Sequence, residues 1–123
     1  MNVVLWILQV ALAVLFLMAG LLKATQPMDK LLPKMPAMAD FPVGVVRFIG
    51  IAELAGAVGL ILPAATGIAP VLTPLAATGL VIIMIGAMAT HARRREPSSI
   101  VVNAALLIAA AVIAWGRFGP YAL

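Results

Sequence analysis

Residues 43–62 read VGVVRFIGIAELAGAVGLIL, a run in which only Arg47 and Glu53 carry a charge. At 1.5 Å per residue, a helix of this length extends about 30 Å, which matches the hydrocarbon thickness of a bilayer. The segment is therefore predicted to cross a membrane. The whole chain agrees with this prediction, since 65% of its 123 residues are hydrophobic and 10% are charged.

Three further apolar segments have the length and composition of membrane spans, at residues 2–22, 69–90 and 99–115. Residues 23–42 contain four prolines, which exclude a long regular helix, so we expect an interfacial loop there. The sequence thus predicts an all-α fold, with residues 1–123 forming a single transmembrane domain that is an integral membrane four-helix bundle.

The basic residues are distributed unevenly between the predicted loops. Loops 23–42 and 91–98 contain Lys23, Lys30, Lys34, Arg93, Arg94 and Arg95, whereas the opposite end has only Arg117. By the positive-inside rule, we expect a multi-pass protein of the cell membrane with these two loops cytoplasmic and both termini outside. Trp6 and Trp115 would then lie near the outer interface as aromatic anchors.

Composition excludes several functional classes. The net charge of +4 is scattered between long apolar runs rather than interleaved with aromatic residues, which argues against nucleic acid as a partner. The chain has no cysteine, and so it anchors no disulfide, thiolate metal site or iron–sulfur cluster. His91 is the only histidine, which excludes a bis-histidine haem or metal site within one chain. We therefore expect no metal site.

Glu53 is the main candidate for a functional residue, because an ionisable side chain inside a span costs a few kcal/mol. It lies about 15 Å into its predicted helix, close to the bilayer midplane. Gly50, Gly56, Ala57 and Leu60 share its helical face, so we expect the carboxyl to point into the bundle. Unless a cation lies close, it should be protonated and donate a hydrogen bond. A purely structural carboxyl that bonds across helices is the alternative.

Other polar residues are predicted at two depths. Gln9 and Thr78 lie about 20 Å and about 18 Å from the cytoplasmic boundary, where they are candidate partners for Glu53. Arg47 and Asn103 lie about 6 Å deep, although Arg47 can snorkel to the interface. The predicted ligand-binding residues are Glu53, Arg47, Gln9, Thr78, Asn103, Lys23 and His91. Topology and headgroup contact are the alternative interpretation of Lys23 and Arg47, and no catalytic residue is predicted.

Three motifs resemble the DoxX-like family over nearly the whole chain. They are AGLLK at residues 19–23, the second-span pattern with Arg47, Gly50, Glu53, Gly56, Gly59 and Pro63, and Met84-x-Gly86-Ala87 followed by His91. The resemblance implies a four-helix membrane bundle. Some members are membrane subunits of thiosulfate:quinone oxidoreductases and others associate with soluble redox or detoxifying enzymes, while most have no assigned activity. Lys23, Arg47, Glu53 and His91 are the family-like polar residues.

Three functional hypotheses follow from these residues and from the resemblance. The leading one is a membrane subunit or partner of a quinone-linked redox system, with a Glu53-centred pocket for a quinone or similar hydrophobic molecule. A redox enzyme would then be the partner. The second is a small proton-coupled transporter of lipophilic compounds, working as a homo-oligomer. The third is a non-catalytic membrane scaffold or assembly factor.

Overall fold

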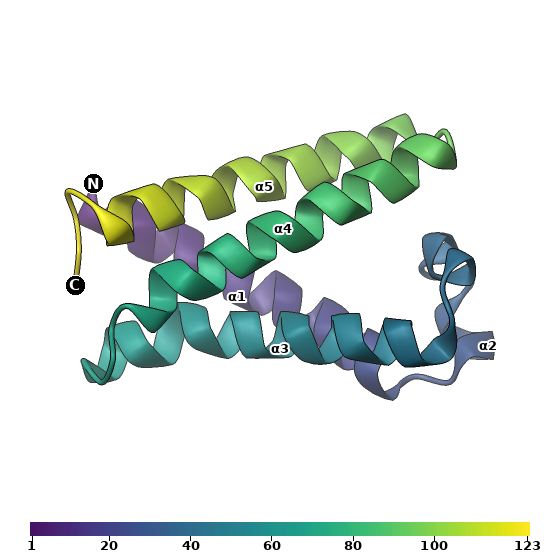
Figure 1. The fold of residues 1–123 in the computed structure, drawn as a ribbon, viewed down its shortest axis with the longest axis horizontal. Coiled ribbons are helices and arrows are strands. Elements are labelled where there is room, and N and C mark those ends of the chain that lie inside the picture. The colour runs from purple at the N-terminus through teal and green to yellow at the C-terminus, as the bar shows by residue number, and fades with distance from the viewer.

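The computed structural model describes residues 1–123 and contains helices without strands (Figure 1). Its four long helices are α1 (Asn2–Thr25), α3 (Val43–Thr66), α4 (Leu72–Arg93) and α5 (Pro97–Phe118). Between α1 and α3 lie a short helix, α2 (Met28–Leu31), and a 3-10 helix, η1 (Pro36–Asp40). All four long helices are apolar and long enough to cross a membrane. The predicted all-α class and four-helix membrane bundle are confirmed.

The long helices are arranged as two pairs. α1 packs along α3, and α4 packs along α5, while α3 also contacts α4 and α1 contacts α5 less extensively. The buried core joins the pairs through large side chains, among them Leu12, Phe16, Leu60, Leu80 and Ile113. Figure 1 shows the pairs diverging toward the end where α2 and η1 lie, whereas both chain termini lie at the other end. The space between the diverging pairs contains the candidate site described below.

Several helix ends differ from the predicted ones. α1 continues past Leu22 to Thr25, so the connection to α3 is residues 26–42, and its prolines leave only short helical pieces. α5 begins at Pro97, because proline suits a first helical turn, and extends to Phe118. α4 begins at Leu72 rather than at residue 69, so that Pro74 falls within its first turn.

Pro63 does not end α3 as its position had suggested. The helix continues to Thr66 and ends at Gly67, whose left-handed φ of 73° closes a helix most easily with glycine. Pro63 has no N–H to donate to the carbonyl of Gly59, four residues earlier. The hydroxyl of Thr73 in α4 donates to that carbonyl at 2.9 Å. The neighbouring helix thus satisfies the acceptor that proline leaves free, and α3 continues by one turn.

The buried face of α3 is the one that its spacing predicted. Its buried residues are Val46, Gly50, Glu53, Gly56, Ala57, Leu60 and Pro63. The outer surface of the bundle is apolar, with Phe48, Ile82 and Ile108 each more than half exposed. A polar interior acid combined with an apolar exterior is the arrangement expected for a bundle surrounded by lipid.

Candidate functional site

An ion pair between Lys23 and Glu53 is at the centre of the candidate site. The Nζ of Lys23 lies 2.6 Å from Oε1 of Glu53, and the two side chains are 12% and 1% exposed. Lys23 belongs to the last turn of α1 and reaches into the bundle, where its ammonium group donates to Glu53. Glu53 is therefore not isolated in the bundle, because the ammonium group of Lys23 lies beside its carboxyl group.

Two glycines allow this pair to form. A Cβ atom added to Gly50 would lie only 2.6 Å from the backbone nitrogen of Ala24, and one added to Gly20 would lie 2.8 Å from the carbonyl oxygen of Gly50. Such approach of two backbones is possible only where side chains are missing. Close packing of α1 against α3 thus places the carboxyl group of Glu53 within reach of the Lys23 side chain.

Arg47 contacts the backbone of Lys23 and so stabilises the end of α1 that carries the ion pair. Its Nη1 donates to the backbone carbonyl of Lys23 at 2.8 Å. A cation at the last carbonyls of a helix is favoured by the helix dipole and satisfies an acceptor that has no intrahelical donor. Arg47 therefore bonds to the end of α1 and does not line the cavity. The sequence had given it as a ligand-binding residue that could also snorkel to the interface.

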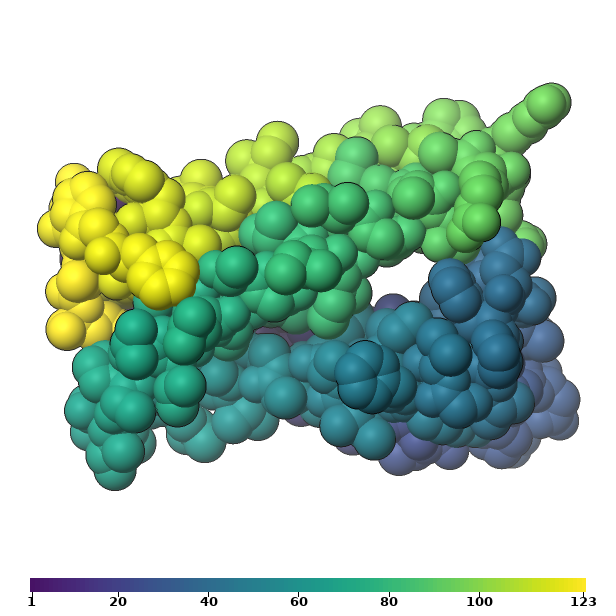
Figure 2. All heavy atoms as spheres, viewed as in Figure 1, coloured from purple at the N-terminus to yellow at the C-terminus, as the bar shows by residue number.

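A cavity of about 650 Å³ lies beside this pair, between the two helix pairs and the connection at residues 26–42. Its apolar wall includes Phe16, Met38, Phe41 and Ile83. Its polar lining consists of Lys23, Lys34, Glu53, Thr90, His91, Arg93, Glu96, Ser99 and Asn103. Figure 2 shows the corresponding hollow on the flank of the bundle, between α4 and the connecting residues above α3.

Asn103 has its side chain in this cavity without a protein partner. The residue is 9% exposed, it lines the cavity, and its amide forms no hydrogen bond with any other residue. Oε2 of Glu53 likewise has no hydrogen bond, since Lys23 contacts Oε1. These donors and acceptors face the open space of the cavity, where they can bond to a polar group of a ligand.

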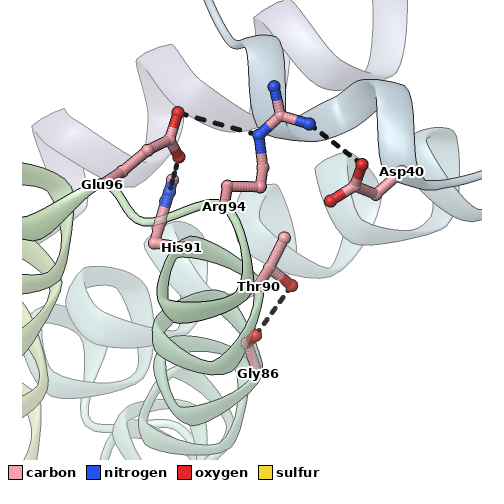
Figure 3. A network of polar contacts seen from close by, with 6 residues as sticks. All are labelled: Asp40, Gly86, Thr90, His91, Arg94 and Glu96. Atoms are coloured by element: carbon pink, nitrogen blue, oxygen red, sulfur yellow. Dashed lines mark hydrogen bonds and ion pairs between the residues drawn. The ribbon is translucent and has the colours of Figure 1, made fainter.

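A second polar network closes the rim of the cavity (Figure 3). Nδ1 of His91 lies 2.7 Å from Oε1 of Glu96, and Nη1 of Arg94 donates to Oδ1 of Asp40 at 2.9 Å. Nε of Arg94 lies 3.7 Å from Oε2 of Glu96, too far for a hydrogen bond. Asp40 belongs to η1 and the other residues to α4 and the following turn. Arg94 thus ties the connecting residues to the α4–α5 turn.

The structure brings together only some of the seven predicted residues. Lys23, Glu53, His91 and Asn103 line the cavity, and Arg47 supports Lys23 from outside it. Gln9 and Thr78 do not contact Glu53. Nε2 of Gln9 donates to the carbonyl of Leu60 at 2.6 Å, and the hydroxyl of Thr78 donates to Pro74 in its own helix at 2.8 Å. The three residues share a depth but face different directions.

Sequence reasoning predicted His91 but missed the other rim residues, Asp40, Arg94 and Glu96, and it missed Arg117 as well. Asp40 and Arg94 are 54 positions apart, and no local pattern joins them. His91 and Glu96 flank a short turn, which is a signal that could have paired them. Arg117 was counted as a loop charge, yet it belongs to the last turn of α5 and is 3% exposed. It forms a separate polar cluster with Gln9 and Asn2.

Comparison with known proteins identifies one relationship. A family model described as the DoxX-like family matches residues 7–113 of the chain. No curated protein and no solved structure matches it. The matched residues span the core of the bundle and all the residues that line the cavity. They exclude Asn2 and Arg117.

Proposed function

The chain belongs to the DoxX-like family of multi-pass membrane proteins, and from this premise we propose that its cavity binds a hydrophobic molecule with a polar head, of the quinone class. The protein would serve as the membrane subunit or partner of a redox enzyme that supplies the electron-transfer centres. Its loops 23–42 and 91–98 would face the cytoplasm. The basic residues at this end support that orientation, because positively charged loops are retained on the cytoplasmic side.

One observation carries the proposal, namely a cavity that combines an apolar wall with hydrogen-bonding groups that have no partner within the protein. Its volume of about 650 Å³ falls within the range of small-molecule sites. The amide of Asn103 and the remaining N–H groups of Lys23 can donate to ring carbonyls, as an ammonium carries three donors and Glu53 takes one. The apolar walls suit a ring and its tail. Asn103, Lys23, Glu53 and His91 are thus the proposed ligand-binding residues.

Asn103→Leu is the first test of this proposal. The substitution removes no hydrogen bond within the protein, so the thermal stability should stay the same or rise. Native mass spectrometry of the detergent-purified protein measures the binding of a decyl-tailed ubiquinone. We expect this binding to weaken about tenfold, which is the effect of one lost hydrogen bond. Thr78→Val is the matched control, because Thr78 bonds only within α4 and does not line the cavity. Equal binding by both variants would contradict the proposed site.

Gly86→Leu tests the cavity by filling it. Gly86 lines the cavity and has nothing within 4 Å of an added Cβ, so a leucine can be accommodated and will occupy ligand space. Gly79 is equally open, but it lies in an apolar groove on the outside of α3 and α4. We expect Gly86→Leu to reduce quinone retention at least about tenfold and Gly79→Leu to leave it unchanged. Comparable loss in both variants would point to a general effect on α4 instead of a blocked site.

A scaffold function is the second candidate, favoured by the close packing of α1 on α3 around the ion pair. In that case the pair stabilises the bundle and the cavity has no ligand. Unaltered quinone binding in Asn103→Leu and Gly86→Leu would favour it. A proton-coupled transporter of lipophilic cations is less well supported, because Lys23 already occupies the position beside Glu53 that such a cation would need.

A further inference from the structure

A second polar site lies at the end of the bundle opposite the cavity, around the side chain of Arg117. Its Nε donates to Oε1 of Gln9 at 2.8 Å, and its Nη1 donates to Oδ1 of Asn2 at 2.6 Å and to the carbonyl of Tyr121 at 3.0 Å. Arg117 is 3% exposed, and its Nη2 is buried without any hydrogen-bond partner. We name these four residues the Arg117 cluster.

The Arg117 cluster contains a buried cation and no anion. Arginine keeps its charge in proteins, and the three groups that accept from it are neutral. The chain has four acidic residues. Three of them, Asp29, Asp40 and Glu96, lie in the connecting residues and the α4–α5 turn at the other end, and Glu53 is paired with Lys23. A buried ion without a counter-charge is strongly unfavourable, so the balancing charge is expected from outside these side chains.

The surroundings of the cluster indicate the source of that charge. The guanidinium lies 5.8 Å from the ring centre of Trp6, and the rings of Trp115 and Tyr121 meet edge to face at 6.0 Å. Trp115 is half exposed on the outer surface. Tryptophan and tyrosine gather at the level of lipid headgroups, where phosphate groups are concentrated. Arg117 is thus at the end of its span and at the depth of lipid phosphates.

We propose that the Arg117 cluster binds the phosphate of one anionic lipid headgroup. Guanidinium groups bind phosphate through two parallel N–H···O bonds, and Nη2 has its donors free. Residues 119–123 are exposed, and the Tyr121 carbonyl on Nη1 is an acceptor that a phosphate oxygen can replace. The site is independent of the cavity and of the quinone proposal, and Asn2 and Arg117 lie outside the residues matched by the family.

Asn2→Asp provides a test that keeps the fold intact. The substitution is isosteric and places a carboxylate where Asn2 now accepts from Arg117 at 2.6 Å, so the cation gains an internal counter-charge. Ser98→Asp is the matched control, because it adds the same charge to the first turn of α5 at the opposite end. In detergent without lipid, Asn2→Asp should raise the midpoint of thermal unfolding more than Ser98→Asp does.

Lipid binding is then measured by native mass spectrometry with added phosphatidylglycerol, phosphatidylcholine or inorganic phosphate. We expect the wild type and Ser98→Asp to retain one phosphatidylglycerol, and Asn2→Asp and Arg117→Gln to bind it at least about tenfold more weakly. Unchanged affinity in Asn2→Asp would overturn the proposal, even if Arg117→Gln fails to fold. Stabilisation by inorganic phosphate without preference for phosphatidylglycerol would overturn the lipid as the source of the phosphate.

Discussion

Lys23→Met is expected to destabilise the protein by about 3–5 kcal/mol, the cost of leaving one member of a buried ion pair without its partner. Glu53 is 1% exposed, and Lys23 is the only cation bonded to it. Methionine retains the length and the apolar stem of lysine, so packing is little changed and the lost charge accounts for the effect. The measurement is reversible unfolding of the detergent-purified protein, with helix content as the signal that monitors it.

The double variant Lys23→Met with Glu53→Leu separates the lost charge from the lost contact. Replacing both members of a buried pair by apolar residues of similar size is often neutral or stabilising, so the double variant should recover most of the stability. Such recovery would also show that the pair is retained for a reason other than stability. If Lys23→Met alone unfolds like the wild type, the ion pair contributes nothing to the folded bundle, and its short distance has no energetic meaning.

Gly50→Val should have the second large effect. The added Cβ would lie 2.6 Å from the backbone nitrogen of Ala24 and 2.8 Å from the backbone carbon of Lys23. Unlike side chains, the backbone atoms of a helix cannot rotate away from the added Cβ, so α1 and α3 must separate. Overpacking in ordinary cores costs about 1–3 kcal/mol, and we expect at least the upper end here, since separation also lengthens the contact between Lys23 and Glu53. The same unfolding assay measures the resulting decrease in the free energy of unfolding.

Gly44→Ala is the matched control in the same helix. Nothing lies within 4 Å of a Cβ at Gly44, so alanine should be neutral or stabilise by about 0.5–1 kcal/mol through its helix propensity. A Gly50→Val variant as stable as Gly44→Ala would mean that α1 and α3 do not pack at the distance described, and the geometry of the ion pair would fail with it.

The helices and the inward face of α3 could be predicted from sequence, whereas the partners of Glu53 could not. Apolar length identifies a span, and the spacing of Gly50, Glu53 and Gly56 identifies one face of one helix. Depth along the membrane is equally predictable, but depth does not fix the direction in which a side chain points. Gln9 and Thr78 share the depth of Glu53 and bond elsewhere, because the rotation of each helix is set by its neighbours.

Charged residues near helix ends were the main source of error. Lys23 and Arg117 each stand where an apolar run stops, so both were counted among the charges that determine orientation, although Lys23 was also predicted to bind a ligand. In the structure each lies in the last turn of its helix and turns inward. A lysine or arginine at such a position can reach either the headgroups or the interior, and only the packing of the adjacent helix decides between them. The glycines of the AGLLK motif and of α3 were the available signal for Lys23.

The hollow shown in Figure 2 has a consequence for how a ligand would be measured, because it opens sideways between α4 and the connecting residues near one end of the bundle. The proposed ligand is soluble in the bilayer, so its relevant concentration is its mole fraction there. Membrane-soluble compounds accumulate in that phase far above their level in water. By mass action, a site of modest intrinsic affinity is then largely filled, and binding constants referred to the aqueous phase would overstate its strength.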